Sequence, residues 1–275
     1  MKITICKLSI IMILSGFILP LTSCWDATTY RDSDKYPDQT IYMPTAFPNN
    51  GQYIIDDISR IRGTLPIEGN PYKYVIDLAK REFRVPLAAY RAGINNKGTF
   101  TVDVKVNTEI IETVNANREV KYQLIPSDKY SLVNSVVMQD GEEIAKFDLI
   151  VNLDFLRENF PNAIFALGIE ISSAQREKNP SLSTTAVIIY TKIVKPTASF
   201  TNSIDAADKR KVNFVNTSLM SSDYQWNFGD GSEVSNAASP SHVYSAAGTY
   251  TVTLTAIGIT GNEDKSVLSK IITIE

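Results

Sequence analysis

The chain has 275 residues, of which 44% are hydrophobic and 21% are charged, and its formal net charge is −3. This composition excludes collagen-like and intrinsically disordered chains, and the length suits one or two folded domains. The slight acidic excess, without a clustered basic face, argues against a protein that binds nucleic acid.

The first residues have the pattern of a secretory signal peptide. Lys2 and Lys7 give a positive start, and residues 8–19 form an apolar run broken only by two serines and one glycine. A run of about a dozen residues matches the core of a signal peptide and is shorter than the roughly 20 residues that span a membrane. We therefore expect residues 1–23 to be removed as a signal peptide and the rest of the chain to lie outside the cytoplasm.

The four residues Leu21-Thr22-Ser23-Cys24 resemble the lipobox of bacterial lipoproteins. The resemblance implies that the Cys24 sulfur carries a diacylglycerol, so that membrane lipid is a partner of the chain through Cys24. Two or three acyl chains anchor a protein stably, whereas one holds it only marginally. This predicts an outer-membrane lipoprotein at the cell surface, with the periplasmic face left open. An ordinary secretory peptide, in which Cys24 has no role, is the alternative.

The cysteines limit the chemistry of the mature chain. There are two, Cys6 in the leader and Cys24 at the lipobox. Once the leader is removed and Cys24 is lipidated, the protein has no free thiol and no disulfide. Core packing alone must then hold the fold.

Residues 24–38 are polar and lack periodicity, which predicts a lipidated tether. Residues 39–194 then show short apolar runs separated by turns. The clearest run is 99–106, where Phe100, Val102, Val104 and Val106 alternate with polar residues and are predicted to share one face of a strand.

Other parts of residues 39–194 support an all-β domain. The pair Asp140-Gly141 predicts a hairpin that joins strands at 134–140 and 144–151. Short helical turns are expected at 108–115 and 153–159. About eight strands separated by turns indicate a β-sandwich.

A second, smaller β domain is predicted at residues 196–275, because Pro196 cannot continue a central strand and so marks a boundary. Its best strand is 249–256, in which Tyr250, Val252, Leu254 and Ala256 face inward between threonines. The whole chain is therefore predicted to be all-β, with two tandem immunoglobulin-like β-sandwich domains after a lipoprotein signal peptide.

Residues 196–275 resemble the polycystic kidney disease (PKD) domain, an immunoglobulin-like sandwich. The resemblance rests on residues 224–232, which include Trp226 and Gly229-Asp230-Gly231, and on residues 239–244 and 247–254. It implies that Trp226 packs in the core and that Gly229-Asp230-Gly231 forms a tight turn that needs the conformational freedom of glycine.

Residues 39–194 resemble a Bacteroidetes domain of unknown function, family 1735. The resemblance rests on residues 41–44, 122–130 and 160–169, on the turn at Gly141, and on a closing strand at 188–194. Domains of this family stand at the front of many lipoproteins encoded beside polysaccharide-uptake genes. The resemblance therefore implies glycan capture as part of a polysaccharide-utilisation system.

The sequence contains none of the motifs of common enzymes: no Gly-x-Ser-x-Gly, no His-Glu-x-x-His, no phosphate-binding glycine loop and no cysteine pair for zinc. The carboxylate pairs Asp56-Asp57 and Glu142-Glu143 are adjacent along the chain, so the members of each pair point to opposite faces of a strand and cannot act together.

His242 is the single histidine and stands in the PKD-like motif, which favours a structural role. Asp205, Asp208 and Asp230 are acidic turn residues that form no calcium-loop motif. We expect no enzyme, no cofactor, no metal and no catalytic residue.

The function predicted from the sequence is a non-catalytic, lipid-anchored envelope protein that assists the binding of polysaccharide. Its partners would be a polysaccharide and outer-membrane importer proteins. Candidate ligand-binding residues are tyrosines that could stack on sugar rings, namely Tyr53, Tyr72, Tyr74 and Tyr90. An adhesin-like or scaffolding lipoprotein that binds another envelope protein is the alternative, and a glycoside hydrolase is the least favoured.

Overall fold

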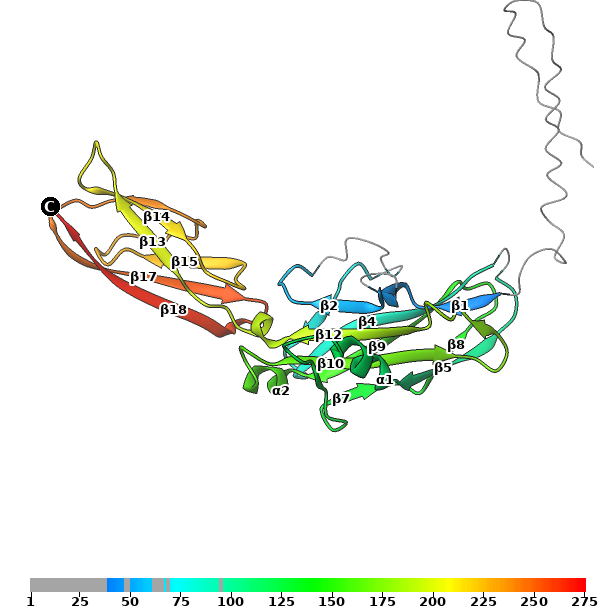
Figure 1. Ribbon diagram of the computed structural model, residues 1–275. Coiled ribbons are helices and arrows are strands. Elements are labelled where there is room, and N and C mark those ends of the chain that lie inside the picture. The colour runs from blue at the N-terminus through cyan, green and yellow to red at the C-terminus, as the bar shows by residue number, and fades with distance from the viewer. Residues whose placement is uncertain (1–38, 47–49, 61–66, 68–69, 94–95) are drawn as a thin grey trace, which may run out of the picture. The chain divides into compact units, whose positions relative to one another are not determined.

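A computed structural model of the chain describes residues 39–275 except 47–49, 61–66, 68–69 and 94–95 (Figure 1). The predicted signal peptide (1–23) and the lipidated tether (24–38), including Cys24, lie outside the described residues. In the part of the chain that is described, no helix is both long enough and apolar enough to cross a membrane.

The larger, N-terminal domain has twelve strands and two short α-helices within the described residues (Figure 1). The strands are β1 Thr40–Tyr42, β2 Gln52–Ile55, β3 Val75–Asp77, β4 Glu82–Arg91, β5 Phe100–Val106, β6 Gln123–Leu124, β7 Tyr130–Leu132, β8 Ser135–Met138, β9 Ile144–Asn152, β10 Ile164–Ser172, β11 Glu177–Lys178 and β12 Thr184–Tyr190. The helices are α1 Glu109–Asn115 and α2 Leu153–Glu158, as predicted, and 3₁₀ turns lie at Pro44–Ala46 and Thr191–Val194.

These strands form two six-stranded sheets. The first, the β4 sheet, has the order β11-β1-β4-β9-β7, with β3 also paired to β4. The second, the β10 sheet, has the order β2-β12-β10-β5-β8, with β6 also paired to β10. The predicted β-sandwich is therefore confirmed.

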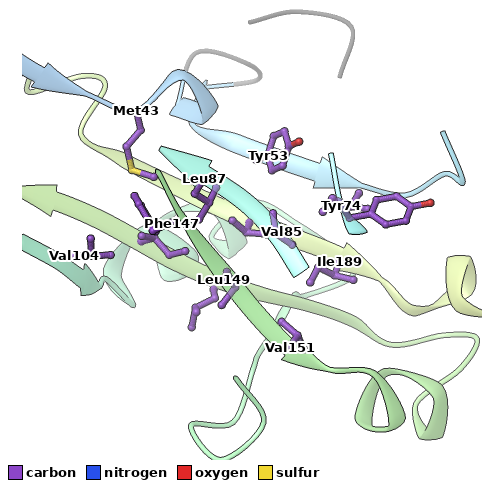
Figure 2. Packing of buried hydrophobic residues seen from close by; sticks show 14 of the residues in the cluster. Met43, Tyr53, Tyr74, Val85, Leu87, Val104, Phe147, Leu149, Val151 and Ile189 are labelled. Atoms are coloured by element: carbon purple, nitrogen blue, oxygen red, sulfur yellow. The ribbon is translucent and has the colours of Figure 1, made fainter. Parts of the chain in front are cut away.

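The core of this domain lies between the inner faces of the two sheets (Figure 2). Alternate residues of β4 and β9 point into it, among them Val85, Leu87 and Leu149, which are 0–1% exposed. They meet residues of the β10 sheet such as Val104 and Ile189. Because side chains alternate along a strand, the same register sends the intervening residues to the outer face.

The outer face of the β10 sheet is partly covered by α1. Ile111 of this helix packs with Tyr122, Ala166, Ala186 and Ile188 in a second, smaller apolar cluster. The approach is so close at Gly168 that a Cβ atom there would lie 1.8 Å from the backbone oxygen of Asn107. A glycine is therefore required at this position.

The predicted hairpin at Asp140-Gly141 is wrong. β8 pairs with β5, whereas β9 pairs with β4 and β7, so the two strands around this turn belong to different sheets. Gly141 does have the positive φ of 86° that such a turn needs. The dipeptide therefore predicts local backbone geometry, while the burial of opposite faces decides which strands pair.

The predicted inward face of residues 99–106 is correct only in part. Phe100, Val102 and Val104 are 0–3% exposed, but Val106 is 40% exposed.

The C-terminal domain consists of β13 Phe200–Ile204, β14 Lys211–Asn216, β15 Asp223–Asn227, β16 Ser241–Val243, β17 Gly248–Gly258 and β18 Gly261–Ile274. They form two three-stranded sheets of order β13-β14-β16 and β15-β17-β18. Trp226 is fully buried between the sheets, with its ring centroid 5.1 Å from that of Phe200 and 5.4 Å from that of Phe214. Its indole N–H donates to the carbonyl of Ala237 at 3.0 Å. The predicted core role of Trp226 is confirmed.

Residues 39–275 form one compact unit, and several contacts connect the C-terminal domain to the larger one. Ile259, in the turn between β17 and β18, is 9% exposed and belongs to the apolar cluster of the larger domain. Arg60 donates from Nη2 to the Ile259 carbonyl at 2.9 Å. Arg157, with a side chain only 9% exposed, forms ion pairs with Glu263 and Asp264.

The turn Gly229-Asp230-Gly231 offers a test of the packing in the C-terminal domain. Both glycines have φ of +80°, but a Cβ at Gly229 would lie 2.4 Å from the Thr251 oxygen, whereas one at Gly231 would meet nothing within 4 Å. Gly231→Ala should therefore cost only the left-handed strain, about 1–2 kcal/mol. Gly229→Ala adds a backbone clash and should cost about 2–5 kcal/mol. Urea unfolding of both variants measures the difference, and equal losses would contradict the packing described.

Candidate functional site

The candidate site is a row of side chains on the outer face of the β4 sheet. Ile41 and Met43 point into the core, so Tyr42 between them points outward. Tyr42 is directly opposite Tyr90 of β4, and Tyr90 is directly opposite Ile144 of β9. Residues paired in this way lie on the same face, which places Tyr42, Tyr90 and Ile144 side by side across three strands. We call these three residues the tyrosine row.

The two rings of the tyrosine row are close and are held by the sheet. Their centroids are 5.6 Å apart and their planes are tilted by 37°. All three side chains of the row are half-buried, so part of their surface remains open to solvent. Burial raises the pKa of Tyr42 above its ordinary value of 10.0, and the charges of Tyr90 and Glu143 add to this. The Tyr42 hydroxyl is therefore protonated at neutral pH and can donate a hydrogen bond.

Charged residues lie next to the row. Lys146 follows Ile144 by two positions on the same face of β9 and is exposed. Glu143 precedes the strand and accepts a hydrogen bond from Asn96 Nδ2 at 2.9 Å. An aromatic surface with a few polar groups at its edge is typical of sites that bind ligands with one apolar and one polar side. A pyranose ring is such a ligand, because its C–H groups form a face and its hydroxyls form an edge.

The structure separates the four tyrosines proposed from the sequence. Tyr90 belongs to the tyrosine row, and Tyr72 is 45% exposed. The prediction of a ligand-binding role is wrong for Tyr53 and Tyr74, because these side chains are 6% and 0% exposed and lie in the core (Figure 2). Tyr74 stacks on Phe83 with a centroid distance of 5.0 Å, and burial raises its pKa to about 12. Neither ring presents a face on which a sugar could stack.

Tyr42 was not predicted as a site residue. The signal was present in the sequence, because Tyr42 alternates with two apolar neighbours and must therefore face outward. Its pairing with Tyr90 could not be foreseen, since these residues are 48 positions apart in the chain and meet only when β1 pairs with β4.

A depression of about 230 Å³ lies near the ends of β4, β7 and β9. Its lining includes Arg81, Glu82, Asp128 and Lys129. These charges largely satisfy one another or their neighbours: Arg81 pairs with Asp154 and with Glu263, and Lys129 with Asp128 at 3.1 Å. Arg81 and Lys129 at the depression are therefore already paired with carboxylates and are less available to a ligand.

Two family models match the chain. One, described as an N-terminal domain, matches residues 37–178, just over half of the chain. The chain belongs to this family. The other is described as a PKD domain and matches residues 193–273, which confirms the PKD domain predicted from the sequence. Neither of the two is a family of enzymes.

Solved structures similar to this chain come from Vibrio and Bacteroides proteins. The PKD1 domain of the Vibrio cholerae metalloprotease PrtV is 30% identical, with 30% of this chain and 98% of that chain covered and a TM-score of 0.27. A Bacteroides ovatus multidomain protein that includes domain of unknown function 1735 is 13% identical, with 83% and 98% covered and a TM-score of 0.37. A Bacteroides ovatus protein provisionally described as carbohydrate binding is 8% identical, with 79% and 64% covered and a TM-score of 0.39.

The single histidine of the PKD domain lies in a polar and aromatic cluster. His242 Nε2 is 2.7 Å from Asp230 Oδ2, and the two side chains are 15% and 12% exposed. The imidazole stacks on Phe228, with centroids 4.0 Å apart and an interplanar angle of 4°, and Tyr244 packs against its edge. His242 is thus enclosed by its own domain, in a position that connects β16 to the turn at Asp230.

Asp205, another acidic turn residue of the PKD domain, also has a local role. Asp205 accepts hydrogen bonds from the amides of Ala207 and Asp208 and forms an ion pair with Lys211 at 3.5 Å. Among the described residues, no group of three or more histidine, cysteine or acidic side chains is placed to hold a metal ion.

The Asp230–His242 pair predicts a loss of stability in acid. Burial alone would raise the pKa of Asp230, but hydrogen bonds from Ser232 and His242 outweigh it and lower the pKa to about 2. An unfolded aspartate titrates near pH 3.9. The ionised carboxylate therefore stabilises the PKD domain fully above about pH 4, and this contribution disappears as the pH falls from about 4 to 2.

Asp230→Asn should accordingly weaken the dependence of the unfolding free energy on pH between about 4 and 2. Urea unfolding at several pH values measures this slope. Asp223→Asn, at an exposed position of the same domain, is the matched control and should keep the wild-type slope. A wild-type slope in Asp230→Asn would contradict the assigned role.

Proposed function

We propose that this chain is a non-catalytic, lipid-anchored protein of the bacterial envelope that captures polysaccharide on the tyrosine row. Cys24 carries the lipid, the N-terminal domain binds the glycan, and the PKD domain acts as a spacer or a surface for protein contact. The captured polysaccharide is passed to an importer of the outer membrane. The observation that supports the proposal most directly is the pairing of Tyr42 with Tyr90 beside Ile144 on an open sheet face.

The chemistry of the row favours binding over catalysis. Tyr42 and Tyr90 offer ring surface and hydroxyl groups, and Ile144 offers an apolar contact. A glycoside hydrolase instead needs two carboxylates that face each other across the substrate at roughly 5–10 Å. The row has Glu143 beside it, a carboxylate whose charge helps to raise the pKa of Tyr42 and which accepts a hydrogen bond from Asn96. Capture is thus the simpler role for this surface.

The glycan proposal predicts a specific pattern of affinity losses. Tyr42→Ala and Tyr90→Ala, made in the mature chain without its lipid, should each weaken polysaccharide binding about tenfold or more, because each removes a ring contact and a hydrogen-bonding group. Tyr72→Ala removes an exposed tyrosine outside the row and is the control. Isothermal titration against a panel of plant, algal and host polysaccharides measures the affinities.

Two results would contradict this proposal. Binding to no member of the panel would remove the glycan as ligand, and full affinity in both row variants would place the glycan elsewhere. Turnover of any glycan by the purified chain, lost on removal of one carboxylate, would instead support a hydrolase.

A scaffolding role is the second candidate. Val267 and Ile271 are 55% and 74% exposed on β18, on the outer face of the PKD domain. Exposed apolar side chains on a sheet are suited to contact with another protein. A pull-down from the native envelope that yields one stoichiometric protein partner, lost in Val267→Ser with Ile271→Ser, would select this role if glycan binding is also absent.

The lipid anchor has its own test. Wild-type chain expressed in a bacterium that processes lipoproteins should incorporate labelled palmitate and fractionate with membranes. Cys24→Ala should do neither, because the thioether cannot form. Cys6→Ala, which removes the leader cysteine, should behave as wild type. Palmitate labelling that persists in Cys24→Ala would exclude the proposed anchor point.

A further inference from the structure

A second surface cluster lies on the opposite side of the N-terminal domain, at one end of the outer face of the β10 sheet. It contains Tyr190, the last residue of β12, and Tyr122, which immediately precedes β6. Their ring centroids are 6.5 Å apart with an interplanar angle of 73°. Tyr122 is 4% exposed and Tyr190 is half-buried.

The position of Tyr122 is fixed by the end of α1. The Tyr122 amide donates to Asn115 Oδ1 at 2.8 Å, and Asn115 Nδ2 donates to the Tyr122 carbonyl at 2.9 Å. These two bonds connect the backbone of Tyr122 to the last residue of the helix. The ring is therefore held in place before any ligand arrives, which lowers the entropic cost of binding.

Two cations lie on these rings. The Arg118 guanidinium carbon is 4.1 Å from the centroid of Tyr122, and the Lys192 ammonium is 5.0 Å from that of Tyr190. Both side chains are half-buried. A cation over an aromatic face is attracted to it and keeps its position. Arg118 also donates from Nε to the Val120 carbonyl at 3.4 Å, so the terminal N–H groups of its guanidinium are the ones that a ligand would meet.

Several half-buried cations have acidic partners, whereas Arg118 and Lys192, like Arg60, Arg176, Lys195 and Lys270, form no ion pair within the described residues. Arg81, Arg84 and Arg157 each form ion pairs with one or more carboxylates. Within the described part of the chain, no carboxylate lies within ion-pair distance of Arg118 or Lys192.

Asp56, one position beyond β2, is an acidic residue near this cluster. Burial raises the pKa of Tyr122, and the negative charge of Asp56 raises it further. Asp56 is half-buried and forms no ion pair with either cation. Lys121 is nearby in the chain, but its ammonium donates to the Asn115 carbonyl at the end of α1. The balance of two open cations against one carboxylate leaves the cluster with a positive charge.

We propose that Arg118, Lys192, Tyr122 and Tyr190 form a binding site for the carboxylate of an acidic sugar, a uronic acid residue of a polysaccharide. The guanidinium fork of Arg118 matches the two oxygens of a carboxylate, and Lys192 supplies a second positive charge. Tyr122 is buried and serves as the ring on which Arg118 lies, whereas the half-buried Tyr190 and Asp56 can bond to sugar hydroxyls at the edge of the cluster. This site is separate from the tyrosine row, which lies on the other sheet, and so goes beyond the function proposed above.

The experiment compares polygalacturonate, its fully methyl-esterified form, and a sulfated polysaccharide by isothermal titration with the mature chain lacking its lipid. Wild type should bind polygalacturonate and lose at least tenfold in affinity for the esterified polymer, because esterification removes the charge. Arg118→Ala and Lys192→Ala should each weaken binding of polygalacturonate at least tenfold. Lys209→Ala, which removes an exposed cation of the PKD domain, is the charge-matched control and should bind as wild type.

A retained thermal unfolding midpoint would show that each variant is folded, and Arg118→Lys keeps the charge if Arg118→Ala perturbs Tyr122. Equal affinity of wild type, Arg118→Ala and Lys192→Ala would overturn the site, as would binding of none of the acidic polymers. Preference for the sulfated polymer would overturn the carboxylate assignment. Neutral polysaccharides test the tyrosine row, whereas polygalacturonate compared with its methyl ester tests the charge of this site, so the failure of one proposal does not entail the failure of the other.

Discussion

The packing of the β4 sheet against the β10 sheet is the interaction on which the rest of the larger domain depends. No cysteine lies among the described residues, so no disulfide supports this contact, and burial of side chains such as Val85, Leu87 and Ile189 must hold the sheets together. Each such side chain contributes about 1.5–3 kcal/mol when fully buried. A slip of one residue in any strand would turn its apolar side chains outward, so the register is strongly specified.

The same constraint positions the surface features. Because Ile41 must face inward, Tyr42 must face outward, and the pairing of β1 with β4 and β4 with β9 then brings Tyr42, Tyr90 and Ile144 together. No special local sequence is required for the row. It follows from the register of the core, which means that its geometry is as well determined as the core itself.

The sequence predicts features that depend on neighbouring residues more successfully than those that depend on distant ones. The alternation in β17, the two helical turns and the core position of Trp226 are all found in the structure, because each is determined within a few residues or by a specific motif. The hairpin at Asp140-Gly141 fails, since β8 and β9 each find a better partner elsewhere. Tyr53 and Tyr74 fail for a related reason: a tyrosine gives no local sign of whether the opposite sheet will cover it.

The polar groups of the molecule fall into two kinds, and this division guides the functional interpretation. Asp230 and His242 satisfy each other within the PKD domain, and Arg157 is neutralised by Glu263 and Asp264. Groups of this kind have already exchanged water for a protein partner, so a ligand would have to break existing bonds to reach them.

Arg118 and Lys192 are of the other kind. They have given up part of their hydration to lie on tyrosine rings, yet no carboxylate among the described residues forms an ion pair with either of them. A partly desolvated charge without a partner gains more from an incoming anion than a fully hydrated one does, because less water must be displaced and the local dielectric constant is lower. Asn115 fixes the backbone of Tyr122 at the end of α1, so the ring on which Arg118 lies keeps its place. The helix that covers the β10 sheet thus also positions one of the two cations of the proposed site.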